Sequence, residues 1–86
     1  MAKYKIEFKR SVWKDLDKLQ KADRRRILRR IQELADDPRP PQCQKLTGME
    51  RYRVRQGDYR ILYSIEDDRL IVVVVKVGHR REVYER

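Results

Sequence analysis

One short run of the sequence is apolar on both of its alternating faces, and it constrains the fold of the whole chain. Residues 70–77 read LIVVVVKV, so that only Lys76 interrupts the apolar side chains. A strand of this kind has to be covered on both faces, which predicts a central strand in a sheet that helices cover on one side. The long stem of Lys76, close to the strand end, allows its ammonium group to reach solvent.

Two amphipathic helices are predicted ahead of this strand. Ser11 is a good N-cap for the first helix, in which apolar residues recur at helical spacing at Val12, Leu16 and Leu19. Residues 21–23 are predicted to form a turn, from which Asp23 caps the second helix. Pro38 ends that helix, whose apolar face comprises Ile27, Leu28, Ile31, Leu34 and Ala35. Helices joined by so few residues should pack as an antiparallel hairpin, with Trp13 in the core or at an interface.

Apolar and polar residues alternate in three further segments, as in half-buried strands. These segments are residues 3–8, 51–55 and 59–65, and Gly57 supplies the positive φ of the turn between the last two. The order β-α-α-β-β-β predicts an α+β fold, in which a two-helix antiparallel hairpin packs on a mostly antiparallel four-stranded sheet. A chain of 86 residues is long enough for one domain, residues 1–86, with a single modest core.

The charge of the chain indicates a polyanionic partner. Lys and Arg number 23 against 14 Asp and Glu, a net charge of +9. This excess suits RNA, DNA, an anionic membrane surface or an acidic protein segment, and it does not choose among them. Although 43% of the residues are charged, the apolar residues are periodic, so we expect a folded domain.

The sequence lacks the features of disulfide-linked, zinc-binding, secreted and membrane-spanning proteins. Cys43 is the single cysteine, so there is no intramolecular disulfide, and its neighbours lack the spaced ligands of a zinc site. The first ten residues, MAKYKIEFKR, contain no apolar leader region, and no run approaches the ~18 apolar residues of a membrane span. We therefore expect a cytoplasmic protein with no metal, no cofactor and no membrane contact.

Arginines gather in residues 52–60 and 78–84. The first segment, YRVRQGDYR, places Arg53 and Arg55 on one face of a strand and Arg60 at the start of the next. The second, GHRREVY, adds further basic residues and a late tyrosine after the apolar strand. Because neither arginine strand contains a carboxylate partner, we predict a site for an RNA phosphate, which the planar guanidinium binds through two oxygens. Arg81 either joins Arg53 and Arg55 in this site or projects the other way, toward a protein partner.

The second helix carries a basic face opposite its apolar one. An arginine-rich helix face is often no more than solvated surface, and it also suits a nucleic-acid backbone or the rim of a site for an acidic partner. These three interpretations stay open for Arg24, Arg25, Arg26, Arg29 and Arg30.

The segments KYKIEF, KLTGMERYRVRQGDYRILYSI and VVVVKVGHRREVY, in this order and spacing, resemble the RelE/ParE superfamily of small bacterial toxins. The resemblance covers nearly the whole chain and implies a toxin that a co-expressed antitoxin neutralises, the antitoxin being a small acidic protein with an amphipathic helix. The RelE branch is understood to comprise ribosome-dependent mRNA endonucleases. The ParE branch shares the fold and is understood to poison DNA gyrase, so the fold does not choose between them.

The site residues favour the RelE branch. RelE-like nucleases are understood to carry basic residues on the second strand, an arginine opening the third, another after the last strand, and a C-terminal tyrosine. Those positions are held here by Arg53 and Arg55, Arg60, Arg80 and Tyr84. The best-known member has lysines in place of Arg53 and Arg55, and arginine does not give up its proton, so neither residue can serve as a base. If the chain cuts mRNA on the ribosome, the basic helix face would help it dock on ribosomal RNA by neutralising phosphates, through Arg25, Arg26, Arg29 and Arg30.

Cleavage of RNA without a metal most simply uses the 2′-hydroxyl as nucleophile and leaves a 2′,3′-cyclic phosphate and a 5′-hydroxyl. Tyr84 is the candidate base by elimination, and surrounding guanidiniums should lower its phenol pKa. Arg60 and Arg80 would stabilise the developing charge and the leaving group. Tyr84 could instead merely pack the tail, and His79 is expected to be structural or solvent-facing. Other candidates are expected to be turn, ion-pair, core or rim residues: Asp58, Glu82, Tyr52, Tyr59 and Tyr63.

A gyrase inhibitor without chemistry of its own would need neither Tyr84 nor the arginines of the second strand. A plain basic RNA-binding module would explain the charge but not the position of Tyr84. Both remain alternatives to the endonuclease.

Overall fold

A five-stranded sheet with two helices on one face makes up the fold of this computed structural model, which describes residues 3–48 and 50–81. The strand order is β1-β5-β4-β3-β2; β1 and β5 run parallel and the other neighbours antiparallel. The elements follow the chain as β1 (Lys5–Phe8), α1 (Arg10–Asp17), α2 (Lys21–Glu33), β2 (Gln44–Lys45), β3 (Tyr52–Gln56), β4 (Tyr59–Glu66) and β5 (Ile71–His79). The predicted α+β fold is confirmed, with one strand more than predicted.

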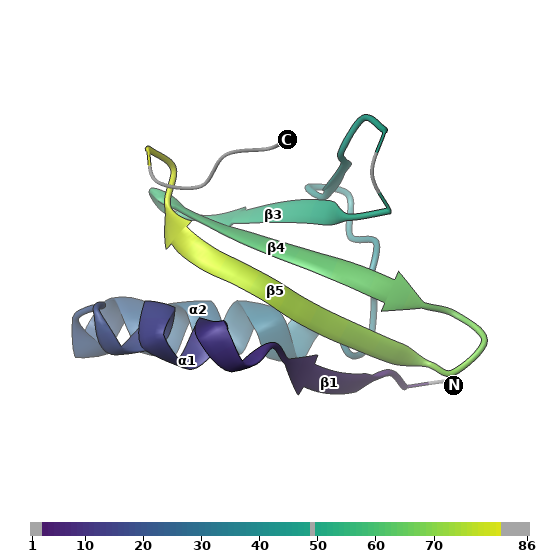
Figure 1. Ribbon diagram of the computed structural model, residues 1–86, viewed down its shortest axis with the longest axis horizontal. Coiled ribbons are helices and arrows are strands. Elements are labelled where there is room, and N and C mark those ends of the chain that lie inside the picture. The colour runs from purple at the N-terminus through teal and green to yellow at the C-terminus, as the bar shows by residue number, and fades with distance from the viewer. Residues whose placement is uncertain (1–2, 49, 82–86) are drawn as a thin grey trace.

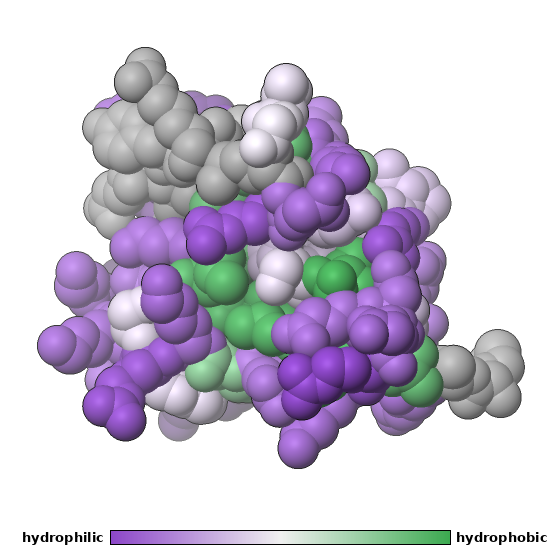
Figure 2. Space-filling model, turned by 45° about the vertical axis from the view of Figure 1, so that its right-hand side comes forward, coloured by the Kyte–Doolittle hydropathy of each residue, from purple (hydrophilic) through white to green (hydrophobic). Residues whose placement is uncertain are grey.

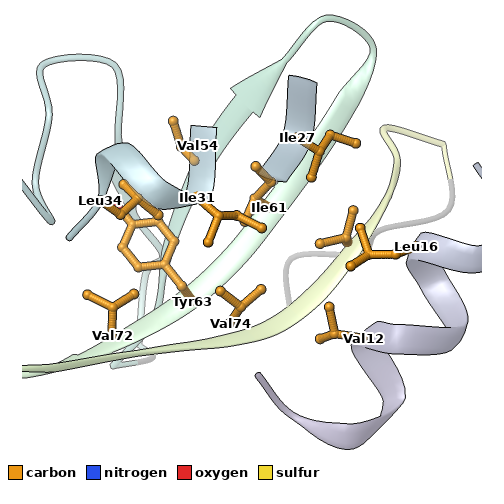
Figure 3. Close-up of a cluster of buried hydrophobic side chains, with 11 residues drawn as sticks. Val12, Leu16, Ile27, Ile31, Leu34, Val54, Ile61, Tyr63, Val72 and Val74 are labelled. Atoms are coloured by element: carbon orange, nitrogen blue, oxygen red, sulfur yellow. The ribbon is translucent and has the colours of Figure 1, made fainter. Parts of the chain in front are cut away.

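The core lies between the helix layer and the sheet. Figure 1 shows α1 and α2 together on one side of β3, β4 and β5. The apolar run forms most of β5, which lies between β1 and β4 as a central strand should. Figure 3 shows side chains from both layers pointing toward one another. The core side chains are Val12, Leu16, Ile27, Ile31 and Leu34 from the helical segment, and Val54, Ile61, Tyr63, Val72, Val74 and Val77 from the sheet.

The other face of the sheet has a small apolar cluster of its own. Leu62 pairs with Lys76 and Tyr63 with Val74, so Val75 is an extra residue in β5 and makes a β-bulge. Leu46, which follows β2, is buried against Leu62, and Val75 packs against both. The segment after α2 therefore covers part of this face.

Strand β2 was missed because two residues are too short for an alternating pattern. Gln44 pairs with Arg53 and Lys45 with Tyr52, so β2 borders only the first two residues of β3. The outer edge of β3 from Val54 onward has no strand partner in the described part of the chain.

Both predicted N-caps are wrong, because each helix begins earlier than its capping signal. α1 begins at Arg10, and the N–H of Lys9 still donates to the carbonyl of Val74 (2.9 Å), so the helix follows directly on the sheet pairing of β1. α2 begins at Lys21, which puts Asp23 in its first turn and Ser11 likewise inside α1. Neither N-cap residue makes a side-chain cap hydrogen bond, so core packing determines where these helices begin.

Lys76 does not simply extend into solvent. Its Nζ lies 3.2 Å from Oδ1 of Asp15, and the N–H of Val77 donates to Oδ2 of the same carboxylate at 3.2 Å. Strand β1 pairs with β5 only as far as Val74, so beyond that point the buried carboxylate of Asp15 takes the place of a strand partner.

The surface is mostly hydrophilic, with a smaller apolar area between polar side chains in the view of Figure 2. Trp13 is 51% exposed and packs in a tilted arrangement against Phe8, with ring centroids 4.7 Å apart, so the alternative that placed Trp13 in the core is wrong. No helix in the described residues is long and apolar enough to cross a membrane.

An exposed network of hydrogen bonds ties three distant segments together. Arg39, after α2, donates from Nη1 and Nη2 to the two oxygens of Asp67 at 3.0 and 2.9 Å, and Tyr4 donates to Oδ1 of Asp67 at 2.8 Å. The hydrogen bonds from Arg39, and then from Tyr4, lower the pKa of Asp67 to about 2. The connection after α2 is thereby fixed to the β4–β5 turn and to the start of the chain.

Replacing this carboxylate should change how stability depends on pH. A depressed pKa stabilises the folded state above the unfolded pKa of about 3.9, and the contribution is lost as the pH falls through the folded pKa. We expect Asp67→Asn to be less stable than the wild type at neutral pH, with a difference that shrinks between about pH 4 and pH 2. Urea unfolding across this range measures it, with Asp68→Asn as control; a difference independent of pH would contradict the assignment.

Candidate nucleic-acid interface

The β3–β4 hairpin brings three arginines to one face of the sheet. Gly57, with φ of +61°, opens a two-residue turn, and the register then places Arg55 opposite Arg60. Because successive side chains of a strand alternate, the neighbours Val54 and Ile61 enter the core. Arg53, Arg55 and Arg60 therefore lie on the face away from the helices, which we call the arginine face.

These arginines differ in burial. Arg53 is only 7% exposed and donates from Nη2 to Oε1 of Gln44, whereas Arg55 is exposed and Arg60 half-buried. Burial, and then repulsion from the guanidiniums of Arg60 and Arg55, lower the pKa of Arg53, although arginine stays protonated at any physiological pH. The hairpin therefore holds like charges close together, an arrangement that an anion would stabilise.

The end of β5 lies beside the turn of the β3–β4 hairpin. The N–H of Arg80 donates to the carbonyl of Asp58 at 2.8 Å, which holds the chain after β5 beside the hairpin turn. His79 pairs with Tyr59, and both border a cavity of about 540 Å³ that α2 also lines, so His79 faces the helices and not the arginine face. The N–H of Arg81 donates to Nδ1 of His79 at 3.2 Å. Tyr84 and Glu82 lie outside the described residues.

The arginines of α2 differ in exposure, and Arg24 is half-buried with its Nη2 donating to the carbonyl of Leu19 at 3.4 Å. Arg25, Arg26 and Arg29 are exposed, and Arg26 lies 3.7 Å from a carboxylate oxygen of Asp23. The side chain of Arg30 is only 20% exposed and lies 3.2 Å from Glu33. Arg30 borders a hollow of about 330 Å³, which we call the edge hollow, together with Gln42, Gln44, Arg53 and Arg55.

Sequence reasoning missed Gln42 and Gln44 in this site, because their position beside the arginines depends on the pairing of β2 with β3.

The arrangement can bind an anion and stabilise negative charge, since no carboxylate in the described part of the chain forms an ion pair with Arg55 or Arg80. The residues described also contain no group of three His, Cys, Asp or Glu that could hold a metal ion.

Comparison with known proteins shows where the chain belongs. Residues 6–84 match the family described as ParE toxin of type II toxin-antitoxin system, parDE. The chain belongs to this toxin family. The mRNA interferase toxin RelE of Escherichia coli strain K12 is 30% identical over 86 residues, which cover 94% of this chain and 90% of that protein.

Solved structures of RelE-type toxins have the same fold. The archaeal RelE–RelB complex from Pyrococcus horikoshii matches with a TM-score of 0.82 at 31% identity, over 96% of this chain and 100% of that one. The RelBE2 toxin–antitoxin complex from Mycobacterium tuberculosis also gives 0.82, at 27% identity over 91% and 99% of the two chains. The resemblance to the RelE/ParE superfamily is therefore confirmed, and this chain is a RelE-type toxin of a toxin–antitoxin system.

Removing one charge from the arginine face should stabilise the fold. Like charges directly opposite one another in a sheet cost roughly 0.2–1 kcal/mol, and Arg55 lies opposite Arg60. We expect Arg55→Gln to raise the free energy of unfolding by about this amount at low salt, and the gain to shrink as salt screens the repulsion. Denaturant unfolding at two salt concentrations measures it, and Arg55→Lys, which keeps the charge, should show no gain. A variant no more stable than the wild type at low salt would contradict the repulsion.

Proposed function

We propose that this toxin is a metal-independent, ribosome-dependent endoribonuclease that cleaves mRNA and so inhibits translation. The observation that carries the proposal is the arginine face, where Arg53, Arg55 and Arg60 lie together and Arg80 follows at the end of β5. The similarity to a protein named mRNA interferase toxin RelE supports the same reading.

The proposed reaction needs no group beyond the RNA, water and the side chains of this protein. The 2′-hydroxyl attacks the adjacent phosphorus, the bond from phosphorus to the 5′-oxygen breaks, and a 2′,3′-cyclic phosphate and a 5′-hydroxyl result. Tyr84, in the phenolate form that neighbouring guanidiniums favour, accepts the 2′ proton as general base and then passes it to the hydroxide left when water protonates the leaving oxygen. Arg60 and Arg80 stabilise the negative charge on the phosphoryl and leaving oxygens, and the leaving oxygen takes its proton from water. Arg53, Arg55 and Arg81 are the proposed phosphate-binding residues.

A cognate antitoxin is the proposed protein partner. The similar structures from Pyrococcus horikoshii and Mycobacterium tuberculosis are toxin–antitoxin complexes. A net charge of +9 on this chain favours an acidic partner, and we propose one with an amphipathic helix that is expressed together with the toxin. The ribosome and its bound mRNA are the proposed targets, in the cytoplasm.

Inhibition of DNA gyrase is the second candidate, because the matching family is described by the ParE toxin. A gyrase inhibitor acts by binding a protein and needs no base or phosphate clamp. The two functions therefore differ in whether translated messages are cut.

Induction in cells, followed by mapping of RNA 5′ ends on translated messages, tests the proposal. We expect new 5′ ends within coding regions for the wild type. Arg80→Ala should lower cleavage about 10²–10³-fold, as for the loss of one donor to a developing oxyanion. Tyr84→Phe should lower it about 10²–10⁴-fold, as for the loss of a general base.

The control is Arg69→Ala, which removes one arginine from the β4–β5 turn, away from the arginine face. It should leave cleavage unchanged. Intact messages accompanied by DNA breaks would show the gyrase function instead. Equal cleavage by the wild type, Tyr84→Phe and Arg80→Ala would leave the nuclease in place and overturn the assignment of its catalytic residues.

A further inference from the structure

The edge hollow lies where the sheet ends and the helix layer begins. Strand β2 covers the edge of β3 only beside Tyr52 and Arg53, so the hollow opens next to Arg55 on an edge without a strand partner in the described residues. An extended ligand on the arginine face can therefore continue around this edge toward α2 without meeting another strand.

The lining of the hollow is cationic and polar. Arg30, Arg53 and Arg55 contribute three guanidiniums, Gln42 and Gln44 contribute two amides, and none of the lining residues carries a carboxylate. A space of about 330 Å³ is roughly ten times the volume of one water molecule in the liquid, so a phosphate group fits.

Arg30 borders the hollow with a side chain that is mostly buried. Its Nη1 lies 3.2 Å from Oε1 of Glu33, whose side chain is 59% exposed. An ion pair with so exposed a carboxylate is weak and leaves other donors of the guanidinium for a phosphate. Arg53 is fixed on the opposite wall by its hydrogen bond to Gln44.

We infer that the edge hollow binds a backbone phosphate of single-stranded RNA, next to the phosphate held on the arginine face, through the guanidiniums of Arg30 and Arg55. The inference rests on the proposed function, in that the RNA is the substrate of this toxin. It removes Arg30 from the set assigned to ribosomal RNA docking and makes Arg30 a substrate-binding residue. Gln42 lies beside the same nucleotide and adds an uncharged hydrogen-bonding group.

Salt dependence distinguishes a phosphate contact from a structural role. Log affinity falls as log salt concentration rises, and each contact with a phosphate of a single strand makes this slope steeper by about 0.7. The probe is a fluorescent 2′-O-methyl RNA oligonucleotide, which cannot be cut because it lacks the 2′-hydroxyl, and its binding is followed by anisotropy between about 50 and 200 mM salt.

We expect Arg30→Ala to weaken binding about tenfold at low salt and to reduce the salt slope by about 0.7. Arg30→Lys keeps the charge and should have the same salt slope as the wild type. Gln42→Ala should weaken binding and leave the salt slope unchanged. Arg69→Ala is the matched control, since Arg69 also pairs with a glutamate three residues away, Glu66 at 3.1 Å, but lies in the β4–β5 turn. It should change neither affinity nor slope.

An unchanged slope for Arg30→Ala, an equal effect of Arg69→Ala, or no binding by the wild type at about 50 mM salt would overturn the inference. Thermal unfolding of each variant shows whether a loss of binding reflects a loss of folding, and Arg30→Lys must then restore binding. Since the probe is never cut, failure of the nuclease and failure of this subsite give different results. If the toxin leaves messages intact, Arg30→Ala can still reduce the salt slope of RNA binding. If the toxin cuts messages, Arg30→Ala can still leave that slope unchanged.

Discussion

Burial of the helix-facing side of β5 is the constraint on which the rest of this structure depends. Val72, Val74 and Val77 lie in one core cluster with the apolar side chains of the helical segment, and β1 and β4 occupy the two edges of β5. The antiparallel pairing of β4 with β5 and of β3 with β4 then fixes which side chains of the hairpin enter the core. Because Val54 and Ile61 take the inner positions, Arg53, Arg55 and Arg60 are carried to the other face. The arginine face is a consequence of core packing.

The same packing holds like charges where they repel one another. Burial and the neighbouring guanidiniums lower the pKa of Arg53, and Gln44 is its hydrogen-bond partner on β2. Core contacts supply the free energy that offsets this repulsion, as is common where a functional site conflicts with stability. An RNA phosphate would relieve the repulsion on binding. The edge hollow extends the same electrostatic environment to α2, through Arg30.

Period-2 and helical patterns predicted both helices, the central strand, the hairpin and the common face of its arginines, because these depend on alternation along the chain. The two-residue strand β2, the helix starts at Arg10 and Lys21, and the Asp15–Lys76 ion pair depend on tertiary contacts that no local pattern records. For the same reason Gln42 and Gln44 were missed, and Arg30 was grouped with its sequence neighbours. Tyr84 lies outside the described residues, and its role as base stays a prediction.

The most direct test uses a message with a single 2′-deoxynucleotide on the 5′ side of a mapped cleavage position, translated by purified ribosomes with the purified toxin. If the RNA supplies its own nucleophile on the arginine face, the all-ribose message is cut to a 2′,3′-cyclic phosphate and a 5′-hydroxyl, and the deoxy-substituted message is not cut there. Cleavage at the substituted position, or 3′-hydroxyl and 5′-phosphate ends on the natural message, would contradict the account.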